Sequence, residues 1–281
     1  MYTFKLVQIT EEAIAETASF LSEVFISTSK FTEDFIKWEY VDNPIGSIVG
    51  FNAYEGDVLV GHYVTQPVIA SVNGKLSKGL LSLNTATHHY HQGKGLFTKL
   101  AKLTFEYAAE NGYEFVYGVA NANSTPGFIK KLGFQFVAPL IVKVGIGILI
   151  KKNDNCNYDF ERVWTKNDIK WRLINPEQPY FLRGNNIMVP TGKFGLNAIL
   201  GNFENELLNN FKVRNLHKKL NVANLYVGID NTIDWKKSFY FDVPSKFKSS
   251  PLNLIFKDLR SENYQLNKEC VKFQIIDFDG Y

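Results

Sequence analysis

The chain has 281 residues, of which 45% are hydrophobic, 15% aromatic and 21% charged, a composition typical of a globular protein with a large core. Its net charge of +3 is too small to make nucleic acid the main partner. The two cysteines lack the spacing of a metal site or a disulfide framework, which fits a reducing compartment. The N-terminal segment resembles no secretion signal and no apolar run is long enough to span a bilayer, so we expect a cytoplasmic protein without membrane insertion.

Two helices and three strands are expected in the first part of the chain. Thr10 is a suitable N-cap for a helix that runs to about Phe25, because its hydroxyl can accept from the first N–H groups of the helix. Thr32 can cap a second, shorter helix. Strands are then expected at 48–56, 58–70 and 78–87, each bounded by turn residues.

The next segment predicts one long helix between two strands. Apolar residues recur at helical spacing over 96–107, and an Asn-Gly pair at 111–112 ends the helix. A strand at 113–119, a short helix and a long strand over 135–150 follow. The order predicts an α/β fold of the α+β kind, with a mixed, mostly antiparallel twisted sheet, flanking helices and one parallel crossover around the helix at 95–111.

The second half of the chain partly repeats the pattern of the first. The polar, aperiodic segment 151–159 predicts a linker between a domain at 1–150 and a domain at 160–281. FIKWEYVDNP at 35–44 returns as DIKWRLINP at 168–176, and a pair of strands follows in both places. We interpret this as a diverged internal duplication, with a chance match as the alternative.

The stretch THHYHQGKGLFTKL at 87–100 could hold either a metal or a phosphate. His88, His89 and His91 lack converging Cys or carboxylate ligands, and neighbours on a strand point to opposite faces, so no metal is expected. Gly93 and Gly95 precede the first turn of a helix, where free N–H groups bind anions. The fingerprints of nucleoside triphosphate and dinucleotide sites are absent. The stretch is therefore either a phosphate cradle of another kind or an ordinary start of a helix.

The same stretch resembles the acyl-CoA pyrophosphate loop of the GNAT superfamily of N-acyltransferases, whose pattern is Q/R-x-x-G-x-G/A. Gln92 and Gly95 match its first two fixed positions, whereas Phe97 stands where Gly or Ala is usual. Further along, NANSTPGFIKKLGF at 121–134 is similar to the asparagine loop and short helix of the superfamily. The resemblance covers about residues 1–150 and implies acetyl-CoA as the co-substrate, with no metal.

The resemblance also implies where acyl-CoA binds. Its pantetheine arm would lie where the strands at 83–87 and 115–119 separate, beside backbone N–H groups that polarise the thioester, and its pyrophosphate would meet the N–H groups of 92–96. The residues implied for CoA binding are Asn84, Thr85, Ala86, Thr87, Gln92, Gly93, Lys94, Gly95, Leu96, Phe97, Asn121 and Phe128.

The catalytic acid and base are less well defined. Many members of the superfamily place a proton-donating Tyr where this chain has Ile129, which leaves Ser124 as a nearby hydroxyl. His62, Glu39 and His88 are candidates for the base that removes the ammonium proton of the acceptor. His62 could equally be a satisfied core histidine, Glu39 a solvated helix residue and Ser124 a helix cap.

The leading interpretation is an N-acetyltransferase that acts on a small-molecule primary amine. Two-repeat chains of this kind resemble enzymes that modify amino sugars in surface-polysaccharide biosynthesis, which makes a nucleotide- or lipid-linked amino sugar our expected acceptor. Trp38, Tyr40, Tyr63 and Tyr90 would suit stacking on a sugar or a base.

Two other functions and the role of the second half stay open. The missing Tyr at position 129 would fit a non-catalytic module that binds CoA or a metabolite, and the two-repeat arrangement would also fit a tRNA-dependent aminoacyl ligase. In the second half, GNFENE at 201–206 places carboxylates where a phosphate would sit, so we expect no CoA site there. That half could instead shape an acceptor groove or a homo-oligomer contact.

Overall fold

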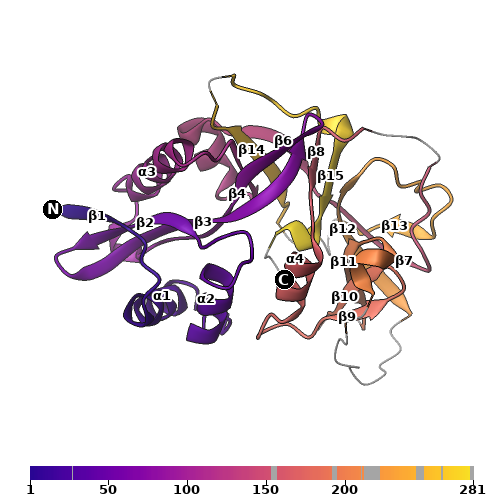
Figure 1. Cartoon of the computed structure of the whole chain (residues 1–281), viewed down its shortest axis with the longest axis horizontal. Helices are drawn as coiled ribbons and strands as arrows, with labels where there is room; N and C mark the ends of the chain where they lie inside the picture. Colours follow the sequence, from indigo (N-terminus) through magenta and orange to yellow (C-terminus); the bar gives the residue numbers. More distant parts are fainter. Residues whose placement is uncertain are drawn as a thin grey trace.

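The computed structural model describes residues 1–26, 28–152, 157–191, 195–209, 211, 222–244, 250–260 and 262–278. Two lobes lie side by side, with the N-terminal half of the sequence in one and most of the second half in the other (Figure 1). Part of the expected linker, with Cys156, lies outside the described residues.

The first half contributes helices and strands in the expected order, with one additional strand at its start. The elements are β1 (Tyr2–Leu6), α1 (Glu11–Val24), α2 (Glu33–Tyr40), β2 (Val49–Glu55), β3 (Val58–Val72), β4 (Lys75–Thr87), η1 (His89–His91), α3 (Leu96–Glu110), β5 (Phe115–Ala120), η2 (Gly127–Lys131), β6 (Gln135–Pro139) and β7 (Ile141–Ile146).

The second half is built from shorter elements. They are β8 (Phe160–Arg162), α4 (Lys166–Leu173), β9 (Phe181–Arg183), β10 (Asn186–Pro190), β11 (Asn197–Asn202), α5 (Asn205–Leu208), β12 (Ala223–Asp230), β13 (Tyr240–Asp242), β14 (Asn253–Asp258), η4 (Lys268–Cys270), β15 (Val271–Gln274) and η5 (Ile275–Asp277).

Both expected helix caps are confirmed. The Thr10 hydroxyl accepts from the N–H of Ala13 at 3.3 Å, and the Thr32 hydroxyl accepts from the N–H of Phe35 at 3.1 Å. β1, in contrast, had no predictive signal, because it is short and owes its conformation to antiparallel pairing with β2.

The described strands form one sheet that continues through both lobes. Its order is β6-β14-β5-β4-β3-β8-β15-β12-β11-β10-β9, and β1, β2, β7 and β13 pair beside this path. α3 covers one face of the first lobe, and α1 and α2 cover the other (Figure 1). β4 and β5, which precede and follow α3 in the sequence, are parallel neighbours in the sheet, as expected. The fold class predicted from the sequence is thus confirmed.

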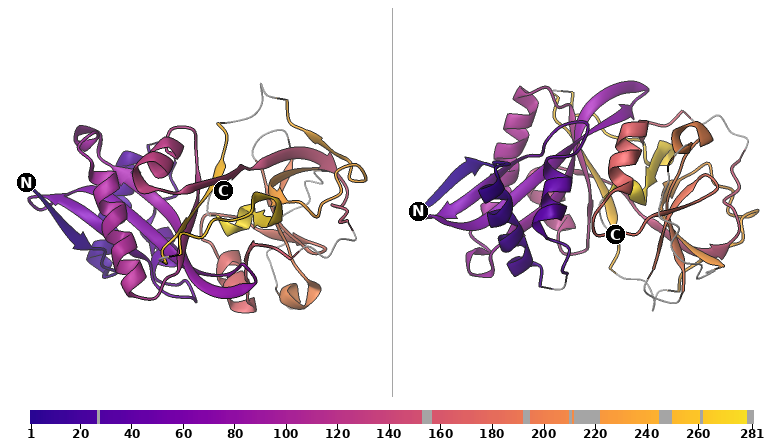
Figure 2. Two further views of the ribbon diagram at one scale, coloured as in Figure 1. Left: turned by 90° about the horizontal axis from the view of Figure 1, so that it is seen from above. Right: turned by 60° about the horizontal axis from the view of Figure 1, so that its bottom comes forward.

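The two halves exchange strands. β14, from the second half, lies between β5 and β6 of the first, and β7, from the first half, pairs with β12 and β13 of the second (Figures 1 and 2). The single long strand predicted over 135–150 is therefore wrong. It breaks at Leu140, whose N–H bonds the carbonyl of Leu252 at 2.8 Å, and its two parts enter different lobes. The domain boundary at about residue 150 stays a prediction. β7, which precedes it, pairs with strands of the second half, and β14, which follows it, pairs with strands of the first half.

The hydrophobic core is continuous between the lobes. One cluster of buried side chains extends from Leu21 in α1 to Leu200 in β11. A second fills the space between α3 and the sheet, around Leu100 and Val116. None of the described helices is long and apolar enough to cross a membrane.

The tryptophans of the repeated sequence motif meet between the lobes. Trp38 on α2 and Trp171 on α4 stack with ring centroids 4.9 Å apart and an interplanar angle of 16°. Each indole N–H donates to the backbone carbonyl of the other tryptophan, both at 2.9 Å. A reciprocal contact between equivalent residues is what a local two-fold relation between repeats produces, so it supports the interpretation as a duplication.

Candidate active site

The parallel strands β4 and β5 separate towards their carboxyl ends. They are paired only where Gly79–Leu81 faces Phe115–Tyr117, and beyond these residues each continues without the other. At the point of separation β4 carries a bulge, because two residues, Asn84 and Thr85, lie opposite one residue of β3. Asn84 has a positive φ of 43°, a conformation that asparagine tolerates better than most residues. The bulge therefore interrupts the regular pairing of β4 with β3 at the point where β4 leaves β5.

A cavity of about 570 Å³ lies in this gap. Its walls come from the bulge of β4, the end of β5, the loop after β5, the start of α3 and the segment between α1 and α2. The lining residues are Phe25, Thr28, Lys30, Phe31, Ser82, Leu83, Asn84, Thr85, Phe97, Gly118, Val119, Asn121, Asn123, Ser124, Gly127, Phe128, Ile255 and Phe278. The size is within the range of small-molecule sites.

The glycine turn lies next to this cavity, at the N-terminus of α3. Gly93 and Gly95 have φ values of 75° and 79°, and a Cβ at either position would meet no atom within 4 Å. Gly95 is the N-cap residue and provides no side-chain cap, so the first N–H groups of α3 are left for another acceptor. Phe97, in the first turn of α3, lines the cavity. This arrangement suits an elongated ligand whose anionic group binds at the glycine turn and whose remainder lies in the cavity.

Six of the residues expected to bind CoA or take part in catalysis line the cavity: Asn84, Thr85, Phe97, Asn121, Ser124 and Phe128. The expected phosphate ligands lie outside its wall, at the bend from β4 into α3, where residues 92–95 are exposed. Ala86 and Leu96 are buried. His62 and Glu39 do not line the cavity.

The asparagine loop is held by its own side chains. The Asn121 side-chain oxygen accepts from the N–H groups of Asn123 at 3.0 Å and Ser124 at 2.9 Å, and the Ser124 hydroxyl lies 3.1 Å from the same oxygen. The short helix that follows contains Ile129, so the position of the family's tyrosine carries no hydroxyl. Ser124 is thus a hydroxyl on the cavity wall, and it also helps to shape the loop.

His62 and Glu39 are both completely buried and belong to one polar network behind the cavity. Asn84 connects them to the cavity wall, because its side-chain amide donates to Glu39 Oε2 at 2.5 Å and to the hydroxyl of Tyr40 at 3.1 Å. The Tyr40 hydroxyl lies 2.8 Å from His62 Nε2. Burial lowers the pKa of His62 to about 3, so the imidazole is neutral near pH 7.

The burial of His62 has a measurable consequence for stability. Because the unfolded state binds a proton near pH 6.5 and the folded state does not, the folded state loses stability as the pH falls from about 6.5 to 3. Between pH 7 and pH 5 this loss amounts to about 2 kcal/mol. Urea unfolding at both pH values should show the loss in the native chain and a much smaller one in His62→Gln. An equal pH dependence in both proteins would contradict the assignment.

Three of the aromatic residues considered for stacking on a sugar are unavailable. Trp38, Tyr40 and Tyr63 are buried in the core, whereas Tyr90 is exposed at the glycine turn. His88 lies 3.1 Å from a Glu23 oxygen. No group of His, Cys, Asp or Glu side chains within the described residues could hold a metal ion.

Several lining residues gave no signal in the sequence. Ile255 on β14 and Phe278 after η5 come from the second half, and only the strand exchange brings them to the cavity. Phe25, Lys30 and Phe31 lie in the connection between α1 and α2, whose path depends on packing and not on a local motif.

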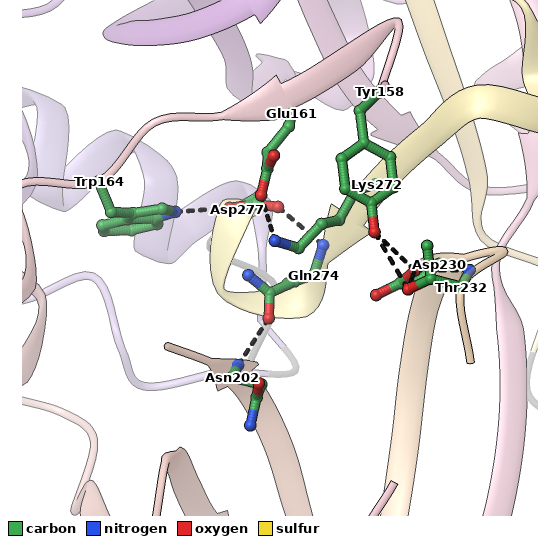
Figure 3. A network of polar contacts seen from close by, with 9 residues as sticks. All are labelled: Tyr158, Glu161, Trp164, Asn202, Asp230, Thr232, Lys272, Gln274 and Asp277. Carbon is green, nitrogen blue, oxygen red and sulfur yellow. Dashed lines mark hydrogen bonds and ion pairs between the residues drawn. The ribbon is translucent and has the colours of Figure 1, made fainter. Parts of the chain in front are cut away.

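The second half has an equivalent pair of parallel strands, but its gap is filled. β11 and β12 are paired at Asn197–Ile199 and Asn224–Tyr226, as β4 and β5 are. Further along, β15 pairs with β12 at Gly228–Asp230, and the side chain of Gln274 accepts from the N–H of Asn202 at 2.6 Å (Figure 3). The cavity that remains there measures about 30 Å³.

A polar network holds β15 and η5 in the gap between β11 and β12. Asp277 accepts from the indole of Trp164 at 2.8 Å and from the N–H of Gln274 at 2.7 Å, and Lys272 pairs with Glu161 (Figure 3). The chain's own strand β15 thus takes the place beside β12 that the cavity takes beside β5. That the second half has no donor site stays a prediction.

A family model described as the acetyltransferase (GNAT) domain matches residues 5–137. The matched segment contains the bulge of β4, the glycine turn and the asparagine loop. This part of the chain is therefore similar to the GNAT acetyltransferase family, as its motifs indicated. A comparison with curated proteins gives no match.

Three solved structures resemble the protein over 92% of its length. A GCN5-related N-acetyltransferase from Kribbella flavida has a TM-score of 0.61 and 11% identity, with 72% of its own chain covered. The corresponding values are 0.56, 13% and 73% for a GCN5-related N-acetyltransferase from Anabaena variabilis ATCC 29413. They are 0.57, 8% and 73% for a protein from Enterococcus faecalis V583 described as a probable N-acyltransferase. At such identities the likeness shows the fold alone, and it extends over both lobes.

Proposed function

We propose that the protein transfers an acetyl group from acetyl-CoA to a primary amine in the cavity between β4 and β5. The observation that carries the proposal is the combination of the β4 bulge, the open cavity and the glycine turn at the N-terminus of α3. The bulge offers backbone N–H groups to a thioester carbonyl, and the turn offers N–H groups to a pyrophosphate.

The transfer needs one bond made and one broken. The lone pair of the neutral amine attacks the thioester carbon, the carbon–sulfur bond breaks, and the thiolate leaves with a proton while the amine loses one. Ser124 is the hydroxyl on the cavity wall, beside the asparagine loop, that we assign to give a proton to the thiolate. His62 is too weak a base for the amine, because burial holds its pKa near 3. Glu39 is buried and does not line the cavity, although it accepts from the wall residue Asn84.

For the acceptor we keep a nucleotide- or lipid-linked amino sugar of surface-polysaccharide biosynthesis. The amide and hydroxyl groups of Asn84, Asn121, Ser124 and Thr28 suit sugar hydroxyls, and Lys30 on the same wall suits a linked phosphate. A cytoplasmic location would give access to both acetyl-CoA and nucleotide-linked sugars. The donor site belongs to the half at 1–150, and the half at 160–281 supplies part of the cavity wall.

The proposal is tested by thiol release. With acetyl-CoA and a panel of nucleotide-linked amino sugars, polyamines and lysine peptides, free CoA should appear at a rate that depends on the amine, with an acetylated product of matching mass. The amino-sugar assignment fails if only polyamines or lysine peptides react. Tight binding of acetyl-CoA with no thiol release for any amine would favour the non-catalytic module that the absence of a tyrosine at position 129 suggests.

A further inference from the structure

A chain of hydrogen-bonded side chains connects the cavity wall with the surface of α1. Its members come from α1, β2, β3, α2 and β4, and they are Glu16, Tyr54, Asn52, His62, Tyr40 and Asn84. Glu16 is partly exposed, whereas Asn52, His62 and Tyr40 are buried. Burying polar groups lowers the stability of the fold unless each of them is hydrogen-bonded. The directions of the hydrogen bonds in this network therefore matter.

The surface end fixes the direction of the hydrogen bonds. The Glu16 carboxylate only accepts, so Tyr54 donates its hydroxyl proton to it at 2.7 Å. The Tyr54 oxygen then accepts from Asn52 Nδ2 at 3.2 Å. This orients Asn52 Oδ1 towards His62 Nδ1, 2.6 Å away, and places the proton of the neutral imidazole on Nδ1.

The same logic continues to the cavity. With its proton on Nδ1, His62 can only accept at Nε2, so Tyr40 donates its hydroxyl proton there at 2.8 Å. The Tyr40 oxygen is then free to accept from Asn84 Nδ2 at 3.1 Å, and the second hydrogen of the same amide goes to Glu39 at 2.5 Å. Both hydrogens of the Asn84 amide are therefore committed away from the cavity.

This network does not conduct protons. A proton wire needs groups that take up a proton on one side and release another on the other side, and the amides of Asn52 and Asn84 do not do so at neutral pH. Burial raises the pKa of Tyr40 well above its ordinary value and keeps the hydroxyl protonated, with the charge of Glu39 as a second cause. The network consists of fixed dipoles, and its effect is to hold one amide in one orientation.

The geometry points to Asn84 as the residue that holds the amine of the acceptor. Asn84 Oδ1, left to face the cavity, accepts a hydrogen bond from an N–H of the amine, and this bond directs the lone pair of the amine nitrogen towards the thioester. No described residue donates to Oδ1, and it is not among the buried atoms without a partner. Asn84 lies in the bulge where β4 leaves β5, and so beside the backbone groups that would hold the thioester. This inference rests on the proposed function.

The charges around the amide agree with this assignment. Glu39 accepts from one side of the Asn84 amide, which draws electron density towards Oδ1 and strengthens it as an acceptor. The titratable groups that face Asn84 are Glu39 and Tyr40 from α2, with His62 of β3 behind Tyr40. The one charged side chain among the described lining residues is Lys30, which would hold an anionic part of the acceptor in preference to its ammonium group.

The test distinguishes an effect on turnover of the amine from an effect on binding of acetyl-CoA. In the intact chain, Asn84→Ala should lower kcat/KM for the amine about 100-fold, because an unaligned nucleophile loses the advantage of orientation. The Kd for acetyl-CoA should stay within about twofold of the native value, since the backbone groups at the bulge remain. The matched control is Asn73→Ala, an asparagine that also has a positive φ, of 51°, in the turn between β3 and β4, and its kinetics should not change.

A second variant gives a readout that a purely structural role would not move. Asn84→Asp, made together with Glu39→Gln so that no second carboxylate lies against it, keeps the size and the tolerance of positive φ, but it places a carboxylate next to the amine. The ammonium form is then favoured, so the pH at half-maximal kcat/KM should rise by about one unit. Tyr40→Phe, which frees the amide to turn, should lower kcat/KM for the amine with the native pH profile kept.

Each outcome decides the question. An Asn84→Ala variant that turns over like the native chain, or an Asn84→Asp, Glu39→Gln variant with an unshifted pH profile, overturns the assignment of Asn84. An Asn84→Ala variant that loses acetyl-CoA affinity instead of amine turnover would place Asn84 on the donor side and also overturn it. No turnover by the native chain with any amine would show that the proposed function itself has failed.

Discussion

Replacement of Trp171 by alanine is expected to lower the free energy of unfolding by about 3–5 kcal/mol. The Trp171 ring is buried and stacked on Trp38, and its N–H satisfies the Trp38 carbonyl. The guanidinium carbon of Arg172 lies 4.7 Å from the Trp171 ring centroid and 5.5 Å from that of Trp38. Truncation would leave a cavity at the contact of the two halves and unpair a carbonyl.

Urea unfolding followed by circular dichroism measures this effect. Trp171→Phe keeps most of the stacked surface and loses the hydrogen bond, so its cost should be nearer to about 1 kcal/mol. Because the core is continuous and strands are exchanged, both proteins should unfold in a single transition. Two separate transitions, or a loss below about 1 kcal/mol in Trp171→Ala, would mean that the tryptophan pair does not couple the halves.

Replacement of both Gly93 and Gly95 by aspartate is expected to raise the Kd for acetyl-CoA about 100-fold. The space beside both glycines is open, so the carboxylates fit, but they would lie where the pyrophosphate should bind. Two charges near a phosphate at a protein surface cost about 1–4 kcal/mol each, of which about 1.4 kcal/mol each suffices for the 100-fold effect.

The matched control replaces the same two glycines by asparagine. It has the same shape and the same tolerance of positive φ, but no charge. Its Kd should rise less than about tenfold, and circular dichroism should show α3 intact in both variants. Equal affinities for the aspartate and asparagine variants would exclude a pyrophosphate at the glycine turn.

The sequence predicted the parts of the site that local chemistry determines. Thr10 and Thr32 each cap the helix that directly follows them. Gly93 and Gly95 adopt positive φ values that most other residues would adopt only with strain. The parallel crossover around α3 followed from the order of elements. These features need no knowledge of distant residues.

The sequence could not reveal what long-range pairing decides. Nothing local in 253–258 indicates that β14 lies between β5 and β6, and so the role of Ile255 was not foreseen. Phe278 lines the cavity from its place after η5, which the bond from Trp164 to Asp277 ties to a distant part of the chain. The orientation of the Asn84 amide depends on a network drawn from four other elements, which no spacing in the sequence encodes.

Calorimetric titration of the intact native chain with acetyl-CoA tests the central claim most directly. The open cavity between β4 and β5 and the filled gap beside β12 lead us to expect one acetyl-CoA bound per chain. Failure of a well-folded chain to bind acetyl-CoA would contradict the donor site, and two bound molecules per chain would contradict the account of the second half.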